Sequence, residues 1–227
     1  MGSRDDAEPI APDATLGEDV YKRLVAFVLS NELPADSRIN INRIAKQLDV
    51  SPTPVREALT RLEDAGLVSK THLKGYRTTS VLTEKELVDL YELRLLLEPA
   101  SARLAAEHAD AATIAALRDE LRMYHEAPDD DDAWSYARFS QHDGRLHSLI
   151  ARASGNQAVE RALERTHFHL HAFRLSYEKS AGDTTVDEHE RIVEAIAEHD
   201  PDAAERAMRD HLTASRARLL PSARRAH

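Results

Sequence analysis

One carboxylate and three imidazoles in the second half of the chain are of the types that bind a metal ion. Asp143 and His147 are four residues apart, so a helix would place them on one face. His189 and His211 lie in two later segments that also have helical spacing. On facing helices of a bundle, such side chains can form a site for a divalent ion. The chain has 12 histidines, so spacing alone leaves open whether these are ligands or ordinary surface or core residues.

Helices have to position these side chains, because residues 81–227 contain no convincing strand. Residues 83–86 form a capping-box pattern that opens a long helix, and Pro99 is expected to kink that helix. Turn-forming residues near 110, 128–132, 154–156, 181–183 and 200 divide the remainder into five more helices, with the acidic run at 129–132 as a solvated loop. We therefore expect an all-α bundle of about six helices over residues 81–221 and a tail at 222–227. The apolar stripe expected on the first of these helices consists of Leu87, Leu90, Tyr91, Leu93, Leu97 and Leu104.

Composition limits the class of protein. The 227 residues are enough for one large or two small domains, and 42% hydrophobic residues is too many for a disordered chain. The absence of cysteine excludes disulfides and cysteine-based zinc or redox sites. No apolar run approaches the length of about 18 residues that a spanning helix requires, and the acidic N-terminus lacks the apolar stretch of a signal peptide. We expect a cytoplasmic protein with no membrane partner.

Charge is distributed unevenly along the chain. The net charge is −10, but residues 36–80 carry eight basic and five acidic side chains. A phosphate-binding surface would therefore have to lie in that segment. The excess is small, and without a supporting motif it would indicate only a solvated surface of mixed charge.

Residues 15–80 have the element order of a winged helix-turn-helix. A disordered lead is expected at 1–14, followed by a helix that stops near 31–34 and a short helix at about 42–48. A third helix begins after Ser51, carries Pro52 and Pro54 in its first turn, and ends at Gly66. Two β-leaning runs, 67–71 and 76–79, are separated by residues 72–75 as in a hairpin.

The third helix is the candidate DNA reader. Thr53 and Arg56 lie in its first turns, where a recognition helix meets base edges, and an arginine there can donate two hydrogen bonds to guanine. The alternative is that Arg56 pairs with Glu57 or Thr60 on a solvated face. At the tip of the hairpin, Lys74 and Gly75 could approach the minor groove or the phosphate backbone.

This segment resembles the DNA-binding domain of GntR-type bacterial transcription regulators. The resemblance rests on VSPTPVREAL, the following RLEDAGLV and the wing glycine Gly75, and it covers roughly residues 15–80. It implies contacts with double-stranded DNA from Asn42, Ser51, Thr53 and Arg56. Pro52 stands where some relatives have an arginine, so the operator sequence of those relatives cannot be carried over.

The second half resembles the FCD effector-binding domain of the FadR branch of GntR regulators, which is an antiparallel helical bundle. The resemblance rests on the DxxxH spacing and on EHERIVEAIAEHDPDAAERAMRDHL. Its Asp, His, His, His pattern falls on Asp143, His147, His189 and His211, which implies a divalent ion, with Zn²⁺ as the first choice and Ni²⁺ or Mn²⁺ as alternatives. Among the other histidines, His167 and His171 would share one helix face and could line a pocket.

Arg94 is the candidate effector ligand. It interrupts an apolar stripe, where an unpaired cation would be costly, and it could balance the charge of a small organic acid bound at open metal positions. The alternative is a buried pair with Glu98, four residues further on.

These features predict a ligand-responsive transcription regulator, with repression as the expected sign, rather than an enzyme. It would bind a pseudo-palindromic operator as a homodimer and respond to a small organic-acid effector. Two alternatives remain: a metal-dependent hydrolase or isomerase that uses the Asp/His/His/His site, and a purely structural metal ion.

Overall fold

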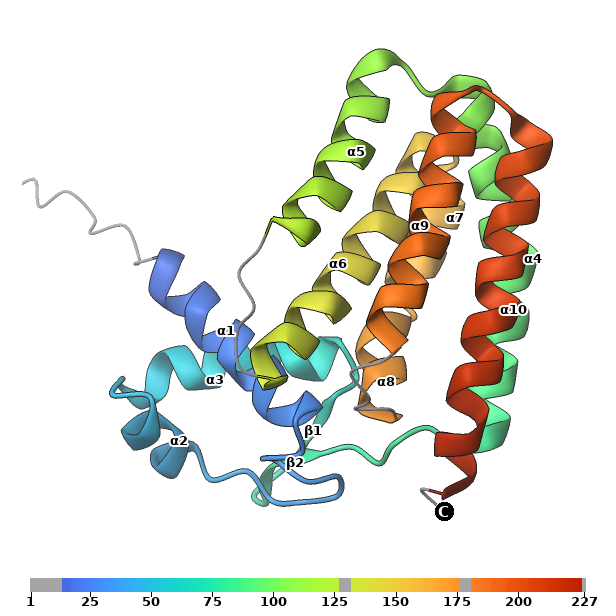
Figure 1. Ribbon diagram of the computed structural model, residues 1–227. Helices are drawn as coiled ribbons and strands as arrows, with labels where there is room; N and C mark the ends of the chain where they lie inside the picture. The colour runs from blue at the N-terminus through green and yellow to red at the C-terminus, as the bar shows by residue number, and fades with distance from the viewer. Residues whose placement is uncertain (1–13, 127–131, 176–180, 226–227) are drawn as a thin grey trace, which may run out of the picture.

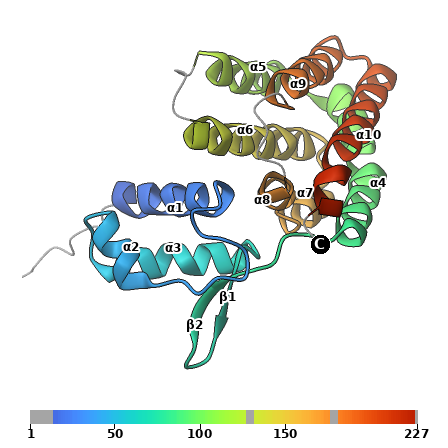
Figure 2. The same ribbon diagram turned by 60° about the horizontal axis from the view of Figure 1, so that its bottom comes forward.

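The first half of the chain folds as three helices and a β-hairpin (Figures 1 and 2). The computed structural model describes residues 14–126, 132–175 and 181–225. Helix α1 packs on α3, while α2 leads into α3 through a tight turn; their bounds are Ala14–Leu29 for α1, Ile41–Gln47 for α2 and Pro52–Asp64 for α3. Strands β1 (Val68–Thr71) and β2 (Gly75–Thr78) are antiparallel, with Val68 opposite Thr78. This is the expected winged helix-turn-helix.

Local signals explain where these helices begin and end. The side chain of Asn40 caps α2 by accepting a hydrogen bond from the backbone of Arg43 at 3.1 Å. Ser51 occupies the N-cap position of α3, and Pro52 follows at the first helical position, where a missing N–H costs least. Gly66 follows α3 with a φ of 71°, a left-handed conformation that glycine adopts without strain. The lead expected at 1–14 lies outside the described residues, except for Ala14, which begins α1.

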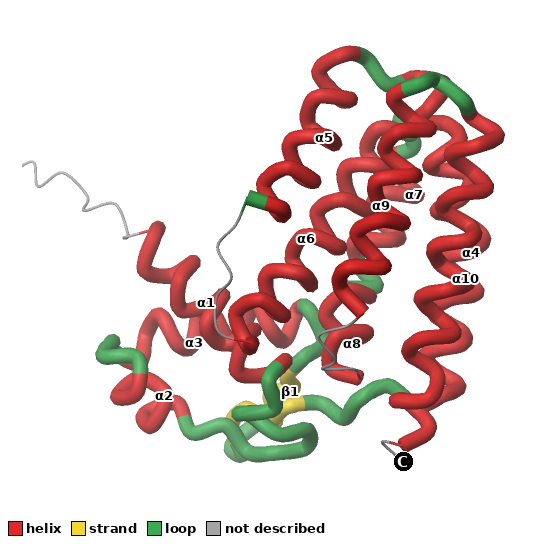
Figure 3. The backbone as a smooth tube through the Cα atoms, in the orientation of Figure 1, coloured by secondary structure: helices red, strands yellow, loops and turns green. Residues whose placement is uncertain are grey.

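The second half is a bundle of mainly antiparallel helices (Figures 1 and 3). Helix α10 packs along α4 and α9, and α6 lies between α4 and α5. Within the described ranges the bundle has seven helices: α4 (Glu84–His108), α5 (Ala111–His125), α6 (Asp132–Ala153), α7 (Gln157–Glu164), α8 (Phe168–Leu175), α9 (Ala181–Ala197) and α10 (Pro201–Arg225). The acidic run expected as a loop lies outside the described residues apart from Asp132, the first residue of α6.

The bundle has one more helix than expected because the helix predicted between the turns near 155 and 182 is divided in two. A single helix was expected between the turns near 155 and 182, but the chain leaves α7 at Arg165 and begins α8 at Phe168. His167 adopts a φ of 43°, a left-handed conformation that ends helical geometry without glycine or proline. His167 and His171 therefore do not share one helix, and the expectation that they do is wrong.

The buried face of α4 also differs from the expected leucine stripe. Leu87 and Tyr91 are buried as predicted, but Leu93 is 37% exposed. The buried face continues instead through Arg94 and Glu98, which pair with each other across one helical turn. Because the two charges compensate each other, Arg94 and Glu98 can lie on the buried face of α4. Helix α4 runs through Pro99 without interruption.

Helix α8 joins the two halves. Leu170 is 4% exposed and belongs to the hydrophobic core of the winged domain, whereas Phe168 packs in the core of the bundle. Arg174 donates hydrogen bonds to the carbonyl oxygen of Thr79 at 2.6 Å and to that of Ser80 at 3.3 Å, in the segment that follows the wing. Figure 2 shows α8 between the winged domain and the bundle. None of the described helices combines the length and apolarity needed to cross a membrane.

Candidate metal centre

Three helices bring the four predicted metal ligands together. Asp143 and His147 project from α6, His189 from α9 and His211 from α10. One ligand atom from each lies within 4.8 Å of the others. The three imidazole rings have centroid separations between 4.8 and 5.4 Å. His189 is fully buried and His211 is 2% exposed.

The second ring nitrogen of each histidine has a partner outside this cluster. The Nδ1 atom of His147 contacts Glu98, and that of His211 lies 2.8 Å from Glu188. The Nδ1 atom of His189 lies 3.2 Å from His142. Histidine ligands are usually held in this way, with one nitrogen paired to a carboxylate or another acceptor and the other turned to the ion.

An unpaired nitrogen tests whether the cluster fits a metal ion. The Nε2 atom of His189 is buried and lacks a hydrogen-bond partner among the described residues. It lies 3.5 Å from Asp143, whose carboxylate is also 3.7 Å from the Nε2 atom of His147. Buried polar atoms rarely remain without a partner, so the unpartnered nitrogen of His189 fits a metal-binding role. An Asp/His/His/His donor set suits a divalent transition metal such as zinc.

Electrostatics keep three of the four predicted ligands, Asp143, His189 and His211, in the forms that bind a metal. Burial lowers the pKa of His189 to about 3 and also lowers the pKa of His211, so both imidazoles are neutral at neutral pH. Burial acts to raise the pKa of Asp143, but the basic groups around it, the guanidinium of Arg94 among them, outweigh burial and hold the pKa well below its usual value. Neutral histidines and an ionised carboxylate are the forms that bind a metal.

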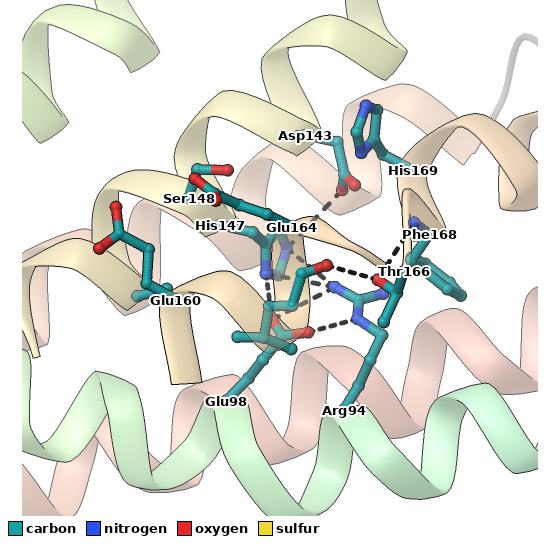
Figure 4. Close-up of a pocket in the computed structure, with 13 residues that line it drawn as sticks. Arg94, Glu98, Asp143, His147, Ser148, Glu160, Glu164, Thr166, Phe168 and His169 are labelled. Atoms are coloured by element: carbon teal, nitrogen blue, oxygen red, sulfur yellow. Dashed lines mark hydrogen bonds and ion pairs between the residues drawn. The ribbon is translucent and has the colours of Figure 1, made fainter. Parts of the chain in front are cut away.

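A small cavity of about 50 Å³ adjoins the cluster, room for only a few water-sized groups. Arg94 and Glu98 reach it from α4, His147 from α6, and Phe168 and His169 from α8 (Figure 4). Of the three histidines at positions 167, 169 and 171, His169 is the one that lines the pocket. His171 instead packs against the winged domain, where a Cβ atom added at Gly66 would lie 3.2 Å from the imidazole ring.

Arg94 is both paired and at the pocket. It forms an ion pair with Glu98, its Nη2 atom lies 3.2 Å from Nδ1 of His147, and its guanidinium carbon lies 3.8 Å from the ring centroid of Phe168. Burial acts to raise the pKa of Glu98, but Arg94 and His147 lower it to about 2. The pair with Glu98, one of the two alternatives for Arg94, is thus present. A carboxylate ligand would have to share Arg94 with Glu98.

The six residues predicted to contact DNA are exposed on the winged domain: Asn42, Ser51, Thr53, Arg56, Lys74 and Gly75. Within the described residues the side chain of Arg56 makes no hydrogen bond or ion pair. The hydroxyl of Thr60 donates instead to the backbone carbonyl of Arg56 at 3.1 Å. The alternative pairing of Arg56 with Glu57 or Thr60 is therefore not present. Gly75 begins β2 with a φ of 82° and no atom within 4 Å of its Cβ position, so the tip of the wing is open.

Comparison with known proteins assigns both halves. Residues 16–78 match the family described as bacterial regulatory proteins, gntR family, and residues 89–214, more than half of the chain, match the FCD domain. The chain is a GntR-family transcription regulator with a C-terminal FCD domain. This regulator is 30% identical to LutR of Bacillus subtilis over 201 residues, which span 79% of this chain and 90% of LutR.

Two further similarities agree with this assignment. The GntR-family regulator is 29% identical over 205 residues to the probable D-xylose utilization operon transcriptional repressor of Paenarthrobacter nicotinovorans, covering 88% of this chain and 87% of that one. Its fold is similar to that of Escherichia coli McbR/YncC, with a TM-score of 0.67 at 20% identity over 90% of this chain and 96% of the other. Because the family and its relatives regulate transcription, the hydrolase or isomerase alternative is not favoured.

Sequence reasoning missed the residues that contact the predicted metal ligands or lie next to them in the hydrogen-bond network: Glu98, Glu120, His142 and Glu188. Each acts across a long sequence separation; Glu98 and His147, for example, are 49 residues apart. Only the pairing of Arg94 with Glu98 had a local signal, since residues four apart on a helix are neighbours.

Proposed function

We propose that this regulator is a repressor whose FCD domain, at residues 81–221, holds a divalent metal ion and a small carboxylate effector. Asp143, His147, His189 and His211 would be the metal ligands, with Zn²⁺ as the first choice and Ni²⁺ or Mn²⁺ as alternatives. The convergence of four ligand atoms within 4.8 Å of one another, together with the unpaired Nε2 atom of His189, carries this proposal. A bound ion would supply open coordination positions and positive charge for a carboxylate.

Arg94 is proposed to orient that carboxylate. Its guanidinium is buried at the pocket, next to the ligand His147. Arginine can bind a carboxylate through two parallel hydrogen bonds, and burial strengthens such bonds. The small cavity volume favours a compact organic acid.

The winged domain, at residues 15–80, is proposed to read operator DNA in the cytoplasm. The six exposed residues from Asn42 to Gly75 named above would contact the operator, with Arg56 in the major groove. We expect a homodimer on a pseudo-palindromic site, because two-fold protein symmetry then matches the two half-sites. Repression is the sign ascribed to the relative from P. nicotinovorans.

Helix α8 offers the route between effector and DNA. Phe168 and His169 face the pocket, while Leu170 and Arg174 hold the winged domain. A ligand that fits only one arrangement of α8 would shift the position of the winged domains and thereby change operator affinity.

The test is DNA binding measured with metal and carboxylate varied separately. Protein stripped by a chelator and protein reloaded with Zn²⁺ would each be titrated onto a duplex taken from upstream of its own gene, with a panel of two- to six-carbon organic acids. We expect an acid that releases the zinc-loaded protein from DNA and has no effect on the stripped protein or on His211→Ala. Equal release from the stripped protein would contradict metal-assisted effector binding. A melting temperature that falls on stripping while acid affinity is unchanged would instead identify the ion as structural.

A further inference from the structure

His142 lies buried between a metal ligand and a carboxylate. Its Nε2 atom is 3.2 Å from Nδ1 of His189, and its Nδ1 atom is 3.0 Å from Glu120. The ring is fully buried, and Glu120 is 6% exposed. Tyr124 stacks on the ring, with a centroid separation of 4.6 Å and an interplanar angle of 29°. The imidazole of His142 is therefore fixed in position by packing as well as by hydrogen bonds.

With a neutral His142, hydrogen-bond chemistry fixes the order of protons along this chain of groups. An ionised carboxylate only accepts, so Nδ1 of His142 must donate to Glu120. Neutral His142 then has a lone pair on Nε2, which accepts the Nδ1 proton of His189. That leaves the lone pair of His189 on Nε2, the atom that faces Asp143 and has no hydrogen-bond partner in the part of the chain that the structure describes.

The other two histidines of the centre, His147 and His211, contact a glutamate directly, without a histidine in between. His147 contacts Glu98, which pairs with Arg94, and His211 contacts Glu188, which pairs with Arg218 at 2.7 Å. Glu120 likewise accepts hydrogen bonds from Arg145 at 2.8 and 2.9 Å. Each ligand histidine is thus backed by a glutamate and an arginine, and in one case His142 is inserted between them.

We propose that His142 and Glu120 are positioning residues for the metal ligand His189. They fix its Nδ1–H tautomer and direct the Nε2 lone pair to the ion. This inference rests on the proposed metal site, but the tautomer can be measured in the metal-free protein as well. Outer partners of this kind typically change metal affinity by about 10- to 100-fold when they are lost.

The test combines His142→Phe, which keeps a ring of similar size, with the milder Glu120→Gln. Zinc affinity would be measured by competition with a chromogenic chelator, and the tautomer of His189 by ¹⁵N NMR of the metal-free protein. The matched control is Glu190→Gln. Glu190 pairs with His125 at 2.9 Å at an exposed site between α5 and α9, the helices that carry Glu120 and His189.

We expect His142→Phe to weaken zinc binding by about 10- to 100-fold and to populate both tautomers of His189. Glu120→Gln should have a smaller effect in the same direction, and Glu190→Gln should have none. Unchanged affinity and an unchanged tautomer in both variants would overturn the inference. If the unaltered protein binds no divalent ion, the proposed metal site fails, whereas the tautomer measurement still decides the role of His142.

Discussion

The residues predicted to contact DNA and the residues of the candidate metal centre differ in burial and in pairing. Arg56 projects into solvent without a partner among the described residues. Arg94 is 3% exposed and contacts Glu98, His147 and Phe168 at once. The difference indicates that one arginine is free for an external partner, whereas the other is integral to the fold. Substitutions should therefore separate into those that change binding alone and those that change stability.

The largest expected effect is at Arg94. Replacing it with leucine leaves Glu98 buried without its cation, and breaking such a pair costs about 3–5 kcal/mol of unfolding free energy. Urea unfolding would measure the loss. The control is Arg103→Leu on the same helix, because Arg103 makes only partly exposed ion pairs and its loss should cost far less stability. Equal losses in the two variants would contradict the contrast between buried and exposed arginines.

A second effect depends on pH and lies at the junction between the two regions. Burial lowers the pKa of His171 from 6.5 to about 4, and Arg174 acts in the same direction. Between these values the unfolded chain binds more protons than the folded chain, so stability is lost as the pH falls below about 6.5. The slope from this group is at most about 1.4 kcal/mol per pH unit.

Urea unfolding at pH 7, 6 and 5 would isolate the contribution of His171 to the pH dependence of the unfolding free energy, by comparison with His171→Gln. The variant should have a flatter pH dependence than the unaltered protein, because its side chain does not titrate. His72→Gln, at an exposed position on the wing, is the control for loss of an imidazole outside the junction. Parallel curves for the unaltered protein and His171→Gln would show that His171 is not held neutral by burial.

The third effect is on DNA binding and not on stability. Arg56→Ala should weaken operator binding by about 1–3 kcal/mol, since a base-contacting arginine is lost. The unfolding free energy should change by less than about 0.5 kcal/mol, as for an exposed side chain without partners. Fluorescence anisotropy on the operator duplex would measure the affinity, with Arg206→Ala on the exposed face of α10 as control. Unaltered affinity in Arg56→Ala would remove it from the DNA interface.

The same contrast explains what could be predicted from sequence. The elements of the winged domain were predicted to within a few residues because caps, prolines and Gly66 are local signals. The pairing of Asp143 with His147 follows from helical spacing alone. The approach of His189 and His211 depends on packing between distant helices, and only the family resemblance indicated it. The seventh helix was missed because the left-handed residue that separates α7 from α8 is His167 rather than a glycine.

The smallest expected effect compares two glycines with similar backbone conformations. Gly66 and Gly75 have φ values of 71° and 82°, so alanine at either position should cost about 1–2 kcal/mol in backbone strain. At Gly75 the added methyl group meets open space, whereas at Gly66 it lies 3.2 Å from the ring of His171. Gly66→Ala should therefore cost more than Gly75→Ala by a few tenths of a kcal/mol or more, because the ring has to move.

A double-mutant cycle decides whether that excess comes from α8. Combining Gly66→Ala with His171→Ala should remove it, because the contact then no longer exists, and Gly75→Ala should be additive with His171→Ala. If the excess persists in the double variant, the ring of His171 is not what Gly66 accommodates. The cost would then belong to the winged domain alone, and His171 would not couple α8 to the end of α3.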